Sequence, residues 1–136
     1  MATFAKTKYL EQKLLNHTLL GEVYTPPDQL YLALFTADPG RLGSTAGEIP
    51  DPDYDRQLIA FTAATDDPTS GSYCQSVLSI DYPQATIDWG YVTHGAIMDA
   101  KTGGNMLYKG PFDVAKQILT GDYYQIPAGE VKVVED

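Results

Sequence analysis

The sequence predicts a mainly β protein, an antiparallel, jelly-roll-like β-sandwich preceded by an N-terminal α-helix. From residue 22 onward, short apolar runs alternate with turn residues about every 8–12 residues, a spacing typical of sandwiches. Residues 5–20 carry the one convincing pattern of apolar residues at helical spacing. The chain has 136 residues, of which 43% are hydrophobic, which suits a single domain with one core.

Residues 5–20 are expected to form an amphipathic helix that ends at Gly21, before two prolines. This end of the chain is locally basic, with three lysines against one glutamate. Two interpretations are open: the helix covers one edge of a sheet, or residues 1–21 form an arm that packs on a neighbouring subunit. The predicted apolar stripe consists of Tyr9, Leu10, Leu14 and Leu15.

Residues 22–136 are expected to form the β domain. Residues 30–36 are apolar on both faces, as in a central strand that is covered from both sides. A hairpin is expected where the paired glycines Gly103 and Gly104 supply the positive φ of a tight turn. The eight predicted strands are residues 30–36, 57–64, 76–82, 92–98, 105–109, 114–119, 123–126 and 130–134.

Two polar segments interrupt this pattern. Residues 38–55 are rich in Pro, Gly, Asp and Ser, and residues 65–72 form a shorter segment of similar composition. A loop as long as the first is usually a contact loop or a mobile one. We therefore expect residues 38–55 to contribute to binding.

Composition excludes several classes of function. The net charge of −9 repels phosphate backbones, so we expect no nucleic-acid partner. No apolar run approaches the roughly 20 residues that span a bilayer, and the N-terminus lacks the apolar core of a signal peptide. The lone Cys74 cannot form an intrachain disulfide, which fits a chain made in a cytoplasm and bound to no membrane.

The residues indicate no catalytic, cofactor or metal site. Asp51, Asp53 and Asp55 alternate as at the start of a calcium loop, but the Gly and Glu that an EF-hand needs are replaced by Arg56 and Thr62. The two histidines are not spaced as metal ligands, and nothing in the sequence assembles Cys74 and His94 into a nucleophile pair. We therefore expect a protein that is not an enzyme.

Aromatic residues favour a surface that binds other molecules. Ten tyrosines cannot all be buried, because each buried hydroxyl needs a hydrogen-bond partner. Exposed tyrosines are typical of protein interfaces and of carbohydrate-binding surfaces. The single Trp89 is expected to close one end of the core.

Two strings carry a family resemblance, WGYVTH at residues 89–94 and TGGN at residues 102–105. Weaker matching pieces lie at residues 9–15, 30–36, 54–57 and 126–131. With these features the chain resembles a family of small structural proteins of tailed bacteriophages, often labelled tail fibre proteins. The resemblance implies a virion component without enzymatic activity, made in the host bacterial cytoplasm.

Within that family we expect a capsid decoration (cement) protein that binds the major capsid protein and stabilises its lattice as a homo-oligomer, with a trimer favoured. The chain has neither the length nor the internal repeat of a fibre shaft, and closed symmetry suits binding at capsid axes. The alternative is a tail fibre or baseplate adsorption component that binds tail proteins or a host surface glycan. The predicted contact residues are Lys6, Lys8, Tyr9, Lys13, Arg41, Asp51, Asp53 and Tyr54.

Overall fold

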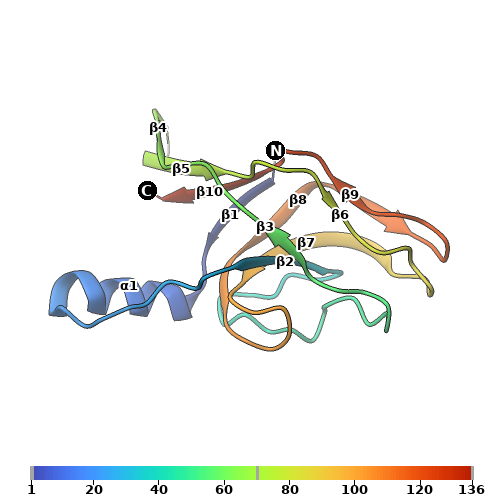
Figure 1. The fold of residues 1–136 in the computed structure, drawn as a ribbon, viewed down its shortest axis with the longest axis horizontal. Coiled ribbons are helices and arrows are strands. Elements are labelled where there is room, and N and C mark those ends of the chain that lie inside the picture. Colours follow the sequence, from blue (N-terminus) through green and yellow to red (C-terminus); the bar gives the residue numbers. More distant parts are fainter. Residues whose placement is uncertain (1, 70, 136) are drawn as a thin grey trace.

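A computed structural model of the chain describes residues 2–69 and 71–135 and is mainly β, with one helix near the N-terminus (Figure 1). This arrangement confirms the predicted fold class. Met1, Ser70 and Asp136, which fall in the predicted arm, the shorter polar loop and the predicted β domain, lie outside these ranges. In chain order the elements are β1 (Ala2–Lys6), α1 (Lys8–Leu20), β2 (Leu30–Phe35), β3 (Gln57–Ile59), β4 (Thr65–Asp67), β5 (Gly71–Gln75), β6 (Ile80–Asp81), β7 (Gly90–Met98), β8 (Met106–Ile118), β9 (Gln125–Ile126) and β10 (Val131–Glu135).

Eight strands form one curled sheet in the order β3-β2-β7-β8-β1-β10-β5-β4, and β6 and β9 form a second, two-stranded sheet. Neighbouring strands run antiparallel except β1 and β10, which are parallel. The sheet is therefore antiparallel, as the sequence predicted, except at this one pair. Strand β1 lies between β8 and β10, antiparallel to the first and parallel to the second.

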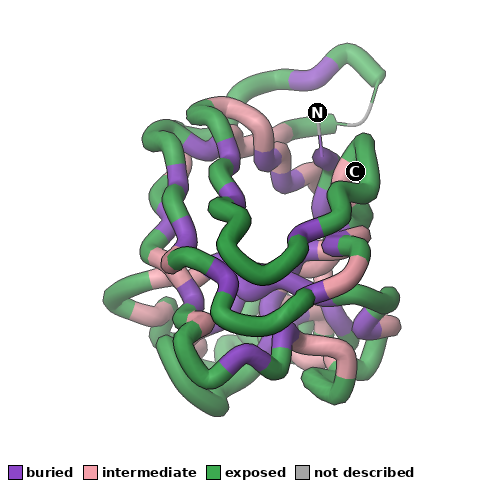
Figure 2. Tube along the Cα trace, turned by 90° about the vertical axis from the view of Figure 1, so that its right-hand side faces the viewer, coloured by how far each residue is buried: buried purple, intermediate pink, exposed green. Residues whose placement is uncertain are grey.

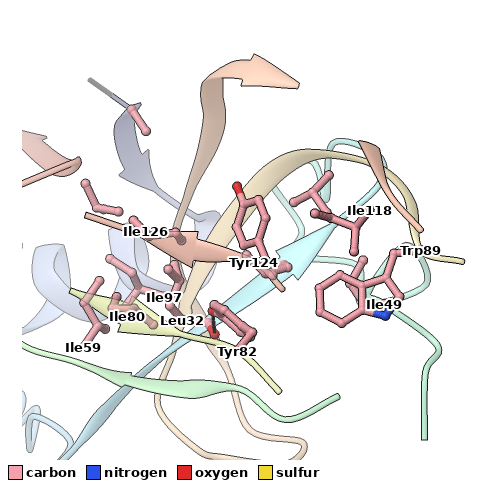
Figure 3. Packing of buried hydrophobic residues seen from close by; sticks show 14 of the residues in the cluster. Leu32, Ile49, Ile59, Ile80, Tyr82, Trp89, Ile97, Ile118, Tyr124 and Ile126 are labelled. Carbon is pink, nitrogen blue, oxygen red and sulfur yellow. Dashed lines mark hydrogen bonds between the residues drawn. The ribbon is translucent and has the colours of Figure 1, made fainter. Parts of the chain in front are cut away.

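The core fills the space between the curled sheet and the β6–β9 pair, which gives the fold its sandwich-like form (Figure 3). Leu32 from β2 and Ile97 from β7 pack in one cluster with Ile80 from β6 and Ile126 from β9. The Tyr82 hydroxyl lies among them and donates to the Leu32 carbonyl at 2.7 Å. Buried and exposed residues alternate along much of the trace (Figure 2), as strands with one covered face require.

One end of this core is closed by Trp89, as the sequence predicted. Trp89 is only 4% exposed and lies beside Ile49 and Ile118 (Figure 3). The predicted glycine turn is also confirmed, since Gly103 and Gly104 have φ values of 62° and 75° in the connection between β7 and β8.

The N-terminal helix is confirmed over residues 8–20, but its predicted start at residue 5 is wrong. Residues 2–6 form β1 because their backbone groups pair with β8 on one side and β10 on the other. Ala2 and Phe4 are fully buried, and the residues between and after them are more exposed, which is the pattern of a strand. The helix begins only where this pairing stops, after Thr7.

Residues 105–109 and 114–119, predicted as separate strands, belong to the single long strand β8. Pro111 lies inside it and cannot donate a backbone hydrogen bond. It faces His94 next to a register shift in β7, between Val92 and His94, and such irregularities are where sheets tolerate proline.

The strands predicted at residues 57–64 and 76–82 are shorter than expected, because continuous pairing is limited to β3 and β6, and Phe61 and Ser76 add only an isolated bridge. The polar segment at residues 65–72 is not simply a loop, since β4 and the start of β5 pair within it. Asp67 ends β4 in a buried position and accepts a hydrogen bond from Lys132 of β10 at 2.7 Å. This ion pair and the backbone pairing of β4 with β5 hold the polar segment on the sheet. No helix in the described residues is long and apolar enough to cross a membrane.

Candidate assembly surface

Helix α1 extends from one side of the β body, and residues 21–29 return beside it (Figure 1). Thr7 precedes it with an extended backbone, but the Thr7 hydroxyl donates to the Met106 carbonyl of β8 at 2.6 Å instead of capping the helix. At the other end Gly21 adopts a left-handed conformation, with φ of 71°. The His17 ring donates to the Glu22 carbonyl at 2.8 Å and supports this turn.

The first turn of α1 is anchored to the body. Leu10 is 3% exposed and packs inward. The Lys8 backbone N–H donates to the Arg41 carbonyl at 2.9 Å, and the Arg41 side chain forms an ion pair with Glu11 at the same distance. Lys6, at the end of β1, pairs with Glu135 of β10. These contacts fix the base of the helix against the long loop and the sheet.

The outer part of α1 presents apolar side chains to solvent. Leu15 and Leu19, one turn apart, are 56% and 73% exposed, and Leu20 and Val23 are 74% and 87% exposed. We call these four residues the α1 face. Leu15 and Leu19 also line a groove of about 750 Å³, together with the residues that anchor the base of the helix. Exposed large apolar side chains close to charged groups are typical of protein interaction sites.

The long loop between β2 and β3 is ordered by a buried polar network. Arg56 is 6% exposed and forms an ion pair with Glu48 at 2.9 Å. The Tyr54 hydroxyl also donates to Glu48 and accepts the Leu34 N–H, both at 2.9 Å. Burial and the neighbouring Glu48 charge raise the pKa of Tyr54 well above its usual value. The Tyr54 ring stacks on Tyr82, so the loop covers the core.

Asp51 fastens the same loop to the segment before β7. It is 3% exposed, and its carboxylate accepts hydrogen bonds from the Thr86 hydroxyl and, at 2.9 Å, from the Trp89 indole. The Thr86 and Asp53 backbone N–H groups donate to it as well. Burial acts to raise the pKa of Asp51, but these hydrogen bonds outweigh it and hold that pKa well below its usual range.

The predicted contact residues therefore fall into two groups. Lys6, Lys8, Tyr9 and Lys13 lie on or beside α1, and Arg41 joins them through Glu11. Asp51, Asp53 and Tyr54 lie in the part of the long loop that covers Trp89 and Tyr82. Asp53 is exposed, whereas the carboxylate of Asp51 and the hydroxyl of Tyr54 are occupied within one copy. A contact role for these eight residues stays a prediction.

Sequence reasoning missed most of the α1 face, because it grouped Leu15 with Leu10 and Leu14 in one apolar stripe and did not single out Leu19, Leu20 or Val23. The sequence did carry a signal: apolar residues lie on more than one side of the helix. If only one face of a helix is covered, some of these residues must be exposed. No group of three or more His, Cys, Asp or Glu side chains in the described residues is placed to hold a metal ion. The candidate surface is therefore defined by its exposed apolar side chains and the charged residues near them.

Residues 5–134 match the protein family described as podophage GP4 fiber I protein gp80. The chain belongs to this family. The match spans both the helix and the β domain, and it confirms the resemblance to tailed-phage structural proteins. No curated protein matches the chain. Membership in the gp80 fiber I family makes the chain a phage virion structural protein, and the exposed α1 face lies within the matched residues.

Proposed function

We propose that this member of the gp80 fiber I family is a capsid decoration protein. It binds the major capsid protein and stabilises the capsid lattice as a homo-oligomer, with a trimer favoured. This role requires no catalytic site. It requires a compact body, a surface for attachment and repeated weak contacts, which a lattice converts into avidity.

The observation that carries the proposal is the α1 face, which extends from one side of the β body. Leu19 and Leu20 are about three-quarters exposed, although the same chain buries Leu10 at the base of the helix. Leaving such side chains in water forgoes roughly 1.5–3 kcal/mol for each one that a partner could bury. The helix is thus built to be covered in an assembly.

Charge supports a position on the outside of a particle. The chain carries a net charge of −9, which disfavours contact with packaged DNA. The described residues form one sheet-based body with no repeated shaft. Both features suit a small protein that sits on the outer surface of a capsid.

A tail fibre component is the second candidate, and the description of the family as a fiber protein favours it. Tyr91 and Tyr123 are 56% and 66% exposed, and exposed aromatic rings are the groups that bind host glycans. In this case tail proteins or a surface glycan would be the partners.

The copy number of the protein relative to the major capsid protein in purified virions separates the two candidates. Quantitative mass spectrometry should give a ratio near one or a simple fraction of the lattice for a decoration protein. A handful of copies per particle would overturn the capsid location and support the tail fibre role.

A second experiment tests the α1 face itself. Removing residues 1–13 would also delete β1 from the middle of the sheet, so point changes are needed. The double variant L15D/L19D should leave the fold intact and reduce the copies retained on virions at least tenfold. Val114→Asp, a change at a residue of β8 that is 76% exposed, is the matched control. If virions retained L15D/L19D in the same number of copies as the wild type, α1 would not be the attachment surface.

A further inference from the structure

We propose that the groove beside α1 binds a segment of the partner protein on the virion that carries carboxylates at one end and apolar side chains at the other. We call it the α1 groove, and it is the groove of about 750 Å³ that Leu15 and Leu19 line. The inference rests on the proposed function, in which that partner is the major capsid protein. It deepens that function by naming the chemistry of the segment that this surface binds.

One stripe of α1 forms a wall of the α1 groove. Lys8, Glu11, Leu15 and Leu19 follow one another at spacings of three and four residues, which place their side chains on one side of the helix. At about 1.5 Å per residue the stripe is roughly 16 Å long. It is charged at the base of the helix and apolar at the outer end, where the two leucines are largely exposed. A matching partner segment therefore has one charged and one apolar end.

The charged end of the α1 groove has an excess of positive charge. Its lining includes three cations and two carboxylates: Lys6, Lys8, Arg41, Glu11 and Glu135. Glu135 pairs with Lys6, and Glu11 pairs with Arg41, so both carboxylates are neutralised within one copy. Lys8 forms no ion pair with any residue that the structure describes. Its ammonium group is therefore available to a partner.

Arg41 is a second cation that a partner can reach. Its side chain is 71% exposed, and its ion pair with Glu11 is made through Nη2. A guanidinium group carries five N–H donors, so the remaining donors can bind a carboxylate from outside. The Arg41 carbonyl accepts the Lys8 N–H at 2.9 Å, which holds the two residues next to each other. This pair of cations favours a carboxylate at the base of the helix.

The charge of the whole chain directs an acidic segment to this place. The net charge of −9 makes most of the protein repel carboxylates, and the α1 groove is a local exception. The α1 face carries no charge of its own, and Glu22 beside Val23 is acidic. The carboxylates of the partner are thus expected at the Lys8 end, and its apolar side chains against Leu15 and Leu19.

Photocrosslinking identifies the occupant. Thr18→benzoylphenylalanine places a photoreactive side chain at an exposed residue that lines the groove outside the α1 face. After irradiation of assembled virions, mass spectrometry should find a cross-linked peptide of another virion protein with more Asp and Glu than Lys and Arg. Val114→benzoylphenylalanine, on β8, is the control and should not capture this peptide. A neutral or basic peptide at residue 18, or one from a second copy of this chain, would overturn the inference.

Charge reversal tests the electrostatic part separately. K8E/R41E should reduce the copies retained on virions about tenfold at low salt, and K8Q/R41Q should reduce them less, because neutral groups do not repel a carboxylate. The loss in K8E/R41E should shrink at high salt, which screens exposed charges. K101E/K116E makes the same change in net charge at exposed residues outside the groove and is the matched control. Circular dichroism verifies that each variant folds.

Wild-type retention of K8E/R41E, or an equal loss in K101E/K116E, would overturn the acidic partner. These outcomes are separate from the location of the protein on the virion. If the copy number fits the capsid lattice but the cross-linked peptide is not acidic, the decoration role remains and this inference falls. If the acidic peptide belongs to a tail protein, the chemistry of the α1 groove remains and the capsid location falls.

Discussion

Arg56 and Glu48 face each other across the long loop through two parallel hydrogen bonds, from Nε to Oε2 and from Nη2 to Oε1, each 2.9 Å long. The remaining nitrogen, Nη1, donates to the carbonyls of Ala100 and Gly103 at 2.9 and 2.8 Å. One guanidinium thereby joins the long loop to the glycine turn between β7 and β8. Only the planar fork of arginine can make all four bonds at once.

Replacing Arg56 by alanine should reduce the free energy of unfolding by about 3 kcal/mol, because Glu48 would keep a largely buried charge without its partner. Arg56→Lys should reduce the free energy of unfolding by less than Arg56→Ala does, but by more than a substitution at an exposed position. Arg41→Ala is the matched control, since its pair with Glu11 is exposed and worth less than about 1 kcal/mol. Urea unfolding measures all three variants, and equal losses for R56A and R41A would contradict the buried role.

Asp51 should make the stability of the protein depend on pH in acid. Burial acts to raise its pKa, but the hydrogen bonds from Thr86 and Trp89 outweigh this and lower it. Because the folded pKa lies below the unfolded value of about 4, the stabilisation is fully present above that pH and is lost as the pH falls through the folded pKa. Asp51→Asn should be less stable than the wild type at pH 6, and its stability should fall less steeply below pH 4.

Urea unfolding at a series of pH values checks this expectation. The exposed Asp53→Asn is the control and should follow the wild-type curve. Some decline should remain in D51N, because the pKa values of Asp38 and Asp88 are also lowered, chiefly by the backbone N–H groups of Gly40 and Thr120. Parallel curves for D51N and the wild type would show that Asp51 is not the main source of acid sensitivity.

Gly110 should tolerate no side chain. A Cβ at this position of β8 would collide with the Thr3 carbonyl oxygen and the Phe4 ring of β1, and the carbonyl belongs to backbone that cannot rotate away. Gly110→Ala should therefore reduce the free energy of unfolding by about 3 kcal/mol or prevent folding. Gly47→Ala places its Cβ in ordinary contact at 3.5 Å from Ala37 and should be nearly neutral. Thermal unfolding compares the two, and similar midpoints would contradict the close approach of β1 and β8.

Much of the β domain could be predicted because alternation and turn residues are local signals. Residues 30–36 and the Gly103-Gly104 turn were recognised in this way, and the structure has β2 and the β7–β8 connection there. Strand β8 was divided because Pro111 resembles a break, although the partner strand accommodates it. Strand β1 was merged with the helix, because five residues do not show which neighbours will pair with them.

The site was less predictable for a physical reason. Glu48 and Arg56 meet because of the path of the loop between them, and no periodic spacing marks such a pair. Likewise, the sequence gives the apolar character of Leu15 and Leu19 but not the fact that the body leaves them uncovered. Exposure depends on where the sheet ends, which only the assembled fold determines.

The two ends of helix α1 should contribute differently to stability. The base is buried and should stabilise a single copy, whereas the exposed outer part should contribute little. Leu10→Ala should reduce the free energy of unfolding by about 3 kcal/mol, because it leaves a cavity where the side chain is 3% exposed. Leu20→Ala removes the same atoms from a position that is 74% exposed. It should change the free energy of unfolding by less than about 0.5 kcal/mol. Urea unfolding at low protein concentration, where copies are separate, makes this comparison. A large loss for L20A under those conditions would mean that a single copy already covers the outer part of α1, and the α1 face would no longer be a surface available for assembly.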